Sequence, residues 1–219
     1  MESIFTIVLI LHIVGGKLGL LTGTINLFRK KGDANHKKNG ILFTYSMFIS
    51  GFAALILSFI NQSNFLFIVG IFTLYLVSSG HRYLHLKPIK NKPEPKILDW
   101  FISITMLLSG ILFIGLGISF LLNSDNFGIV LITFGSLGLI FVLQDFQNYK
   151  GNSKIENFWL IAHIGRMTGA YIASLTAFLV VNWHITNIAL PSFLVWLFPT
   201  AVLVPFIVKW NRKYEIKKK

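Results

Sequence analysis

The sequence has no cysteine and little negative charge. Without Cys among its 219 residues, disulfides, thiolate metal sites, iron–sulfur clusters and thioether-linked haem are excluded. Asp and Glu number 8 against 20 Lys and Arg, and charged residues make up 13% of the chain. A soluble domain carries about twice that share of charged residues. The composition therefore predicts a protein that is mostly embedded in a membrane.

Hydrophobic residues account for 54% of the chain and are grouped into runs as long as a membrane span. An α-helix needs about 20 apolar residues to cross the hydrocarbon core of a bilayer. The runs cover 4–28, 40–60, 65–84, 100–122, 127–146, 158–181 and 192–208. We therefore predict an all-α fold, a polytopic bundle of seven transmembrane helices that forms a single domain over 1–219.

Positive charge is confined to alternate connections between these runs. Lys and Arg cluster after the first, third, fifth and seventh runs, whereas the N-terminal residues and the other connections carry none. Because positive loops remain in the cytoplasm, we predict the N-terminus outside and the C-terminus inside. Residues 85–98 become a proline-containing cytoplasmic linker, after which Asp99 is expected to cap the fourth helix. Residues 209–219 become a basic cytoplasmic tail.

The net charge of +12 has a simple explanation in this topology. A soluble protein with that charge would be a candidate for nucleic-acid binding, but here the charge faces anionic lipid at the cytoplasmic surface. No nucleic-acid partner is therefore predicted. The abundance of Ile, Phe, Asn and Lys favours a bacterial source, and hence the bacterial cytoplasmic (inner) membrane.

Short connections and small residues predict which helices pack together. The connections 61–64 and 123–126 are short, so the second and third runs, and the fourth and fifth, are expected to be antiparallel neighbours. Small residues at intervals of four allow close approach of helices in lipid. They are Gly15, Gly19 and Gly23 in the first run and Gly165, Gly169 and Ala173 in the sixth. We therefore predict that the first and sixth helices contact each other.

Ionisable side chains inside the runs are costly in hydrocarbon and indicate candidate functional residues. Arg166 lies about 15 Å along the sixth helix from its cytoplasmic end, too deep to reach water easily. His163 precedes it by one turn on the same face, and Asp145 at the end of the fifth run is its expected counter-charge. The two readings, a ligand site or an ion pair that locks two helices, are compatible with each other.

Three further side chains extend this list in the first and sixth runs. Lys17 points away from the glycine stripe of the first helix, so it either reaches partly toward the interface or contacts a ligand. His12 lies on that stripe, where a neutral imidazole hydrogen-bonded across a helix contact is expected. Tyr171, about one turn beyond Arg166, is a candidate for the same polar lining.

Histidines raise the possibility of a bound metal. His81 and His85 are spaced i and i+4 on one helical face, as two ligands of one metal would be, and His163 or Asp145 is a candidate third ligand. A b-type haem would need axial histidines on facing helices, for which His81 with His163, or His12 with His184, are the candidate pairs. Arg166 and Lys17 would then contact its propionates.

Two stretches of the sequence carry a family resemblance. One runs from His12 through KGDANHKKNG into the second run, and the other from Trp159 through HIGRM and TAFLVVN. Both resemble a group of predicted bacterial multi-pass membrane proteins classed as domains of unknown function, which implies a small helical membrane protein but supplies no catalytic residue. The chain is also similar to seven-helix zinc hydrolases in having H-x-x-x-H and an Asp, although their order differs.

These observations predict a cytoplasm-facing polar pocket among the first, third, fifth and sixth helices. It would bind or translocate a small, anionic ligand through Arg166, His163, His81, Asp145 and Lys17. The alternatives are a b-type haem redox protein, a zinc-dependent membrane hydrolase, and an accessory or scaffold subunit whose buried charges only fix helix positions.

Overall fold

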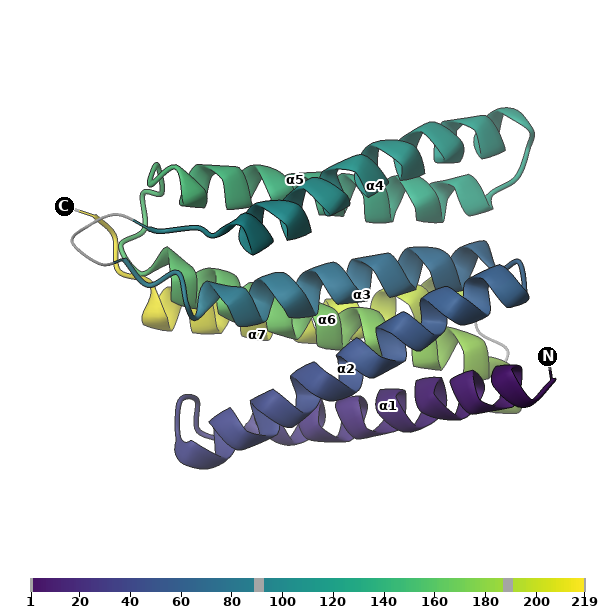
Figure 1. The fold of residues 1–219 in the computed structure, drawn as a ribbon, viewed down its shortest axis with the longest axis horizontal. Helices are drawn as coiled ribbons and strands as arrows, with labels where there is room; N and C mark the ends of the chain where they lie inside the picture. Colours follow the sequence, from purple (N-terminus) through teal and green to yellow (C-terminus); the bar gives the residue numbers. More distant parts are fainter. Residues whose placement is uncertain (1, 89–92, 187–190, 219) are drawn as a thin grey trace. The chain divides into compact units, whose positions relative to one another are not determined.

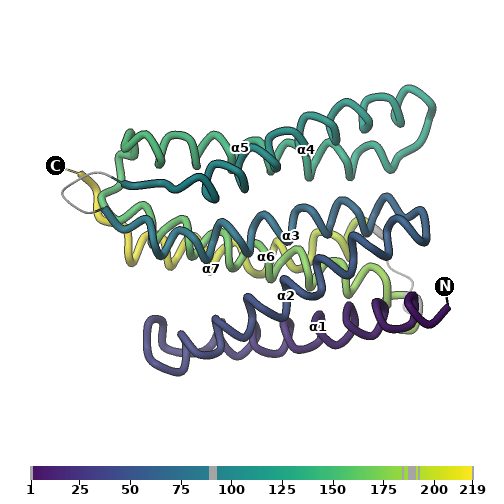
Figure 2. The backbone as a smooth tube through the Cα atoms, viewed as in Figure 1, coloured from purple at the N-terminus to yellow at the C-terminus, as the bar shows by residue number. Residues whose placement is uncertain are grey.

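A computed structural model describes residues 2–88, 93–186 and 191–218, and this part of the chain is helical apart from its connections and one isolated β-bridge (Figures 1 and 2). The elements are α1 Glu2–Phe28, α2 Ala34–Ile60, α3 Asn64–Tyr83, α4 Ile97–Leu122, α5 Phe127–Tyr149, α6 Phe158–Asn182, the 3₁₀ turn η1 Trp183–Thr186, and α7 Ser192–Tyr214. Seven of the described helices are long and apolar enough to cross a membrane. The all-α fold and the seven spans are confirmed, and the orientation stays a prediction.

Several helices extend beyond their apolar runs. The second helix begins at Ala34 rather than at 40, because Asp33 accepts a hydrogen bond from the His36 amide at 2.6 Å and caps it. The fourth begins at Ile97, within the predicted linker. The seventh continues to Tyr214 through two internal prolines. Hydropathy marks the apolar part of a helix, and the caps set its ends.

The chain divides into two compact units. Unit 1 contains Met1–Val77 and Ile164–Tyr214, and unit 2 contains Ser78–His163 and Glu215–Lys219. The boundaries fall inside α3 and α6, so each unit holds part of both helices. The prediction of a single domain over 1–219 is not tested by this division and stays a prediction.

The glycine stripe of α1 packs mainly on α2, and only its last member also meets α6. A Cβ atom at Gly15 would lie 2.9 Å from the Ser46 carbonyl oxygen, and one at Gly19 would collide with Met47. At Gly23 alone in this stripe, Tyr171 of α6 joins α2 in filling the space. Regular spacing shows that a helix presents a close-packing face, but it does not identify the partner.

The small residues of α6 do not form the matching half of that contact. A Cβ atom at Gly165 would meet no described atom within 4 Å, and one at Gly169 would lie 3.6 Å from Leu76 of α3. Ala173 is buried, at 7% exposed. The small residues of the two helices therefore do not pack on each other, but the predicted contact between the first and sixth helices is present where Tyr171 meets Gly23 and Thr24.

In unit 2, α4 and α5 are antiparallel neighbours, as their short connection predicted (Figure 1). Glycines bring the two backbones into contact at two levels. A Cβ atom at Gly135 would lie 2.8 Å from the Gly110 carbonyl oxygen, and one at Gly117 would lie 2.8 Å from that of Gly128. Side chains larger than hydrogen cannot occupy these positions without moving a backbone.

A lysine closes the end of α1 in unit 1. The Lys31 ammonium donates to the carbonyl oxygens of Asn26 at 2.6 Å and Leu27 at 2.8 Å, two of the acceptors that a helix leaves unpaired at its C-terminus. Its nitrogen also lies 4.2 Å from the centre of the Trp210 ring of α7. Burial lowers the pKa of Lys31 below its ordinary value of 10.5.

Candidate functional site: a pocket in unit 1

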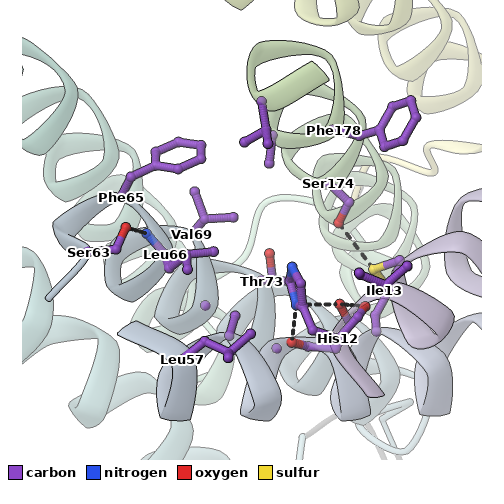
Figure 3. Close-up of a pocket in the computed structure, with 18 of the residues that line it drawn as sticks. His12, Ile13, Leu57, Ser63, Phe65, Leu66, Val69, Thr73, Ser174 and Phe178 are labelled. Atoms are coloured by element: carbon purple, nitrogen blue, oxygen red, sulfur yellow. Dashed lines mark hydrogen bonds between the residues drawn. The ribbon is translucent and has the colours of Figure 1, made fainter. Parts of the chain in front are cut away.

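Unit 1 contains a pocket of about 620 Å³ between α1, α2, α3 and α6 (Figure 3). Apolar side chains make up most of the lining. The polar members are His12, Lys17, Ser50, Asn61, Ser63, Thr73, Ser174 and Asn182. The lining comes from the middle of α1, the first half of α3 and the last half of α2 and α6. The pocket therefore lies toward the end of unit 1 that holds the α2–α3 connection.

His12 is fixed by α2. Its Nδ1 lies 3.0 Å from the Ser50 carbonyl oxygen and 3.2 Å from the Ser50 hydroxyl, which itself donates to the His12 carbonyl at 3.0 Å (Figure 3). A carbonyl oxygen can only accept, so Nδ1 carries the hydrogen and Nε2 is a hydrogen-bond acceptor when the ring is neutral. The hydrogen bond across a helix contact that the sequence predicted is confirmed, with α2 as the partner helix.

Lys17 is the cation of the pocket. It stands near the middle of α1, its side chain is exposed, and it lines the pocket with His12. Within the described ranges, no hydrogen bond or ion pair engages its ammonium group. This placement agrees with the prediction that Lys17 points away from the glycines packed on α2.

Two predicted ligand residues of unit 1 lie apart from the pocket lining. Arg166 is buried, at 2% exposed, with its guanidinium carbon 5.8 Å from the centre of the Tyr75 ring. Tyr171 is also buried, and its hydroxyl shares a hydrogen bond of 2.7 Å with Thr24 of α1. Tyr171 thus fastens α6 to α1 beside Gly23.

Asp145 is the centre of a polar network in unit 2. Its side chain is fully buried and accepts hydrogen bonds from the Tyr83 hydroxyl at 2.6 Å and the Ser103 hydroxyl at 3.0 Å. The Tyr149 hydroxyl lies 3.1 Å from that of Ser103, and the Asn148 amide donates to Tyr83 at 3.1 Å. Helices α3, α4 and α5 are joined by this network. The sequence did not predict these two hydroxyl partners of Asp145.

Arg82 and Asp99 form a bidentate ion pair in the same unit. The guanidinium donates to the two carboxylate oxygens at 2.7 and 2.8 Å, and the Asp99 side chain is fully buried. Asp99 also accepts from the Lys96 amide at 2.8 Å. Asp99 is therefore not the N-cap residue itself: Lys96 holds that position, and Asp99, the third residue of α4, accepts from its amide. Its ion-pair partner, Arg82 near the end of the third apolar run, is not predicted from the sequence.

The histidines of α3 and α6 in unit 2 have local partners. His163 Nδ1 lies 2.8 Å from the Gly80 carbonyl oxygen, so this nitrogen donates. The rings of His81 and His85 are 5.5 Å apart and edge to face. Over the described ranges, no group of three His, Asp or Glu side chains could hold a metal ion, so the three weak metal candidates do not gather. The side chain of His184 lies outside the description.

The predicted ligand residues are divided between the two units. Lys17, Arg166 and Tyr171 belong to unit 1, and His81, Asp145 and His163 belong to unit 2. The cytoplasm-facing pocket and the pairing of Asp145 with Arg166 therefore stay predictions. The predicted linker includes residues 89–92 and the predicted tail includes residue 219, which lie outside the described residues.

Comparison with protein-family models, curated proteins and solved structures gives no match for this chain. The resemblance to a group of bacterial membrane proteins stays a prediction. The pocket in unit 1 is therefore the basis for a proposed function.

Proposed function

We propose that this chain is a bacterial inner-membrane protein that binds a small anionic amphiphile in the unit 1 pocket, with Lys17 as the charge partner. The observation that carries the proposal is the position of Lys17, exposed on the lining of a largely apolar cavity near the middle of an apolar helix. The proposal keeps the anionic ligand and Lys17 from the sequence prediction, but its site does not include the other predicted ligand residues.

The energetics of Lys17 favour a negatively charged ligand. A lysine at the centre of a membrane span costs about 3 kcal/mol on insertion scales. Within the described ranges, no carboxylate offsets this cost at Lys17. A carboxylate or phosphate group bound in the pocket would do so through a charge-assisted hydrogen bond.

The rest of the lining favours an apolar body attached to that head group. Ile13 of α1 and Phe178 and Val181 of α6 line the pocket and are 42%, 44% and 55% exposed. The lining thus reaches the outer surface of unit 1 between these helices. A ligand dissolved in the bilayer could enter from the side and keep its chain against apolar side chains.

The predicted orientation would place this pocket in the half of the bilayer away from the cytoplasm. The pocket lies toward the α2–α3 connection, which carries no Lys or Arg, whereas basic residues follow α1. We therefore propose an amphiphile taken from the outer leaflet, in place of the cytoplasm-facing pocket expected from the sequence.

Tryptophan quenching by a brominated fatty acid tests this proposal. Trp196 packs edge to face on Phe65, which lines the pocket, with ring centres 5.5 Å apart. Dodecanoate brominated at its terminal carbon should quench the fluorescence of the detergent-purified chain. Trp196→Phe should remove the part of the quenching that comes from Trp196. Lys17→Met should weaken dodecanoate binding about tenfold, which is about 1.4 kcal/mol.

Two controls separate charge recognition from simple partitioning. Lys38→Met removes an exposed lysine outside the pocket and should leave dodecanoate binding unchanged. The uncharged brominated dodecanol should bind the parent and Lys17→Met equally. Equal affinity of dodecanoate for the parent and Lys17→Met would show that Lys17 is not the charge partner.

A b-type haem remains the second candidate, because His12 has the arrangement of an axial ligand. Metal-binding histidines commonly donate one ring N–H to a backbone carbonyl, as His12 Nδ1 does to Ser50, while Nε2 is left to bind iron. Lys17 would contact a propionate. A Soret band in the purified chain that disappears in His12→Ala but persists in His163→Ala would favour this reading over the amphiphile.

A further inference from the structure

The C-terminal residues of unit 2 pair with the α5–α6 connection. An antiparallel β-bridge joins Ile155 to Lys217. Next to it, the Lys218 amide donates to the Lys154 carbonyl oxygen at 3.0 Å. These bonds hold a lysine-rich segment in a fixed register against another basic connection.

Further contacts on either side hold the bridge in place. The Glu156 amide donates to the Ile216 carbonyl oxygen at 2.7 Å, and the Ile216 amide donates to Asn157 Oδ1 at 2.9 Å. Ile155 packs against the buried cluster of Tyr83, Leu86, Tyr149 and Phe158. The segment is therefore built into unit 2 through both main-chain and side-chain contacts.

The register places two positive charges opposite each other. Because Ile155 faces Lys217, the neighbouring pair is Lys154 and Lys218, on the other face of the bridge. Like charges directly opposite on paired strands are destabilising. The Lys218 ammonium lies 3.3 Å from the Gly151 carbonyl oxygen, and Glu156 follows Lys154 on the same face. An anion between the two lysines would remove their repulsion.

The aromatic surroundings suit the depth of lipid headgroups. Trp100 and Trp159 are half-buried and pack against the same aromatic cluster as Ile155. The Lys87 ammonium lies 5.7 Å from the centre of the Trp159 ring. Tryptophan and lysine concentrate where a membrane protein meets the headgroup region.

We propose that Lys154 and Lys218 bind the phosphate of an anionic phospholipid headgroup at this end of unit 2. The proposal is independent of the unit 1 pocket, because it rests on the bridge and the lysine register alone. The site is distinguished from a diffuse basic surface by its register, which pairs Lys218 with Lys154 and Lys217 with Ile155.

Native mass spectrometry of the full chain, released from nanodiscs of phosphatidylcholine and phosphatidylglycerol, tests the site. The parent should retain phosphatidylglycerol preferentially. Lys218→Gln should reduce that retention about fivefold, the effect of one lysine near an anionic surface. Lys217→Gln removes the same charge one position away and should reduce retention less.

Asn157→Ala tests whether lipid retention depends on the fixed geometry of the bridge or only on the net charge of the chain. It leaves every lysine in place but removes the side-chain acceptor that holds Ile216, so retention should fall with the charge unchanged. Circular dichroism must show that each variant keeps its helices. Equal losses in Lys217→Gln and Lys218→Gln, or no preference for phosphatidylglycerol in the parent, would overturn the proposal. Displacement of the lipid by excess inorganic phosphate would reassign the site to a free anion.

Discussion

The two aspartates of unit 2 and Lys17 of unit 1 are all charged side chains inside apolar helices, but their surroundings are opposite. In unit 2, Asp99 is fully buried and bidentately paired with Arg82, and Asp145 accepts from two hydroxyl groups. In unit 1, Lys17 faces a pocket with no partner in the described part of the chain. Satisfied polar groups hold helices together, whereas an exposed cation in an apolar pocket is available to a ligand.

The largest effect is expected where a buried charge in unit 2 loses its partner. Arg82→Met leaves the Asp99 carboxylate buried and without its ion pair, so the free energy of unfolding should fall by about 3 kcal/mol. Denaturation in dodecyl sulfate, followed by circular dichroism, measures this change. The double variant Arg82→Met, Asp99→Asn removes the stranded charge and should recover much of the loss. If the double variant is no more stable than the single one, the ion pair does not control this region.

A second test compares two glycines of α4. Gly117→Ala places a methyl group 2.8 Å from the Gly128 carbonyl oxygen, which is backbone and cannot rotate away. Overpacking of this kind costs about 2 kcal/mol. At Gly115 a Cβ atom meets no described atom within 4 Å, so Gly115→Ala should be neutral or slightly stabilising. Equal stabilities of Gly117→Ala and Gly115→Ala would mean that the backbone contact between α4 and α5 at Gly117 does not limit the side chain at that position.

In unit 1, removing a charged side chain should raise the stability of the chain, whereas Arg82→Met in unit 2 should lower it. Lys17→Leu removes a costly cation from the middle of a span, so the ligand-free chain should gain about 1 to 3 kcal/mol of stability. The same variant should lose the stabilisation that dodecanoate gives to the parent. Melting curves with and without dodecanoate measure both quantities. A loss of stability in ligand-free Lys17→Leu would indicate that Lys17 has a structural partner, as the charges of unit 2 do.

The seven helices could be predicted from the sequence, because a membrane span is defined by the apolar residues it contains. The hydrogen bond of His12 across the helix contact could also be predicted, since a polar ring on a close-packed helix face needs a hydrogen-bond partner on the neighbouring helix. The sequence did not identify Ser50 as the partner, or α2 as the neighbour of Gly15 and Gly19. Helical periodicity describes one face of one helix, and nothing in it encodes the element that covers that face.

The pocket could not have been located from the sequence for a related reason. Lining residues such as Leu57 and Val69 have the same character as residues that face lipid. The ion pair was missed because Arg82 lies at a helix end among other cations, where a topological role explained it. Of the lining residues, the sequence pointed to Lys17 and His12, because both are ionisable side chains within an apolar run.

The smallest predicted effect concerns Lys31, which closes α1 through two carbonyl groups. Because burial lowers its pKa, the folded chain binds this proton more weakly than the unfolded chain. The free energy of unfolding should therefore rise as the pH increases from the lowered pKa toward 10.5, with nothing gained above that value. Unfolding of the parent and of Lys31→Gln at a series of alkaline pH values measures the difference in slope. A parent that loses stability relative to Lys31→Gln over this window would show that the carbonyl contacts outweigh burial, and that unit 1, like unit 2, stabilises the charged form of this side chain.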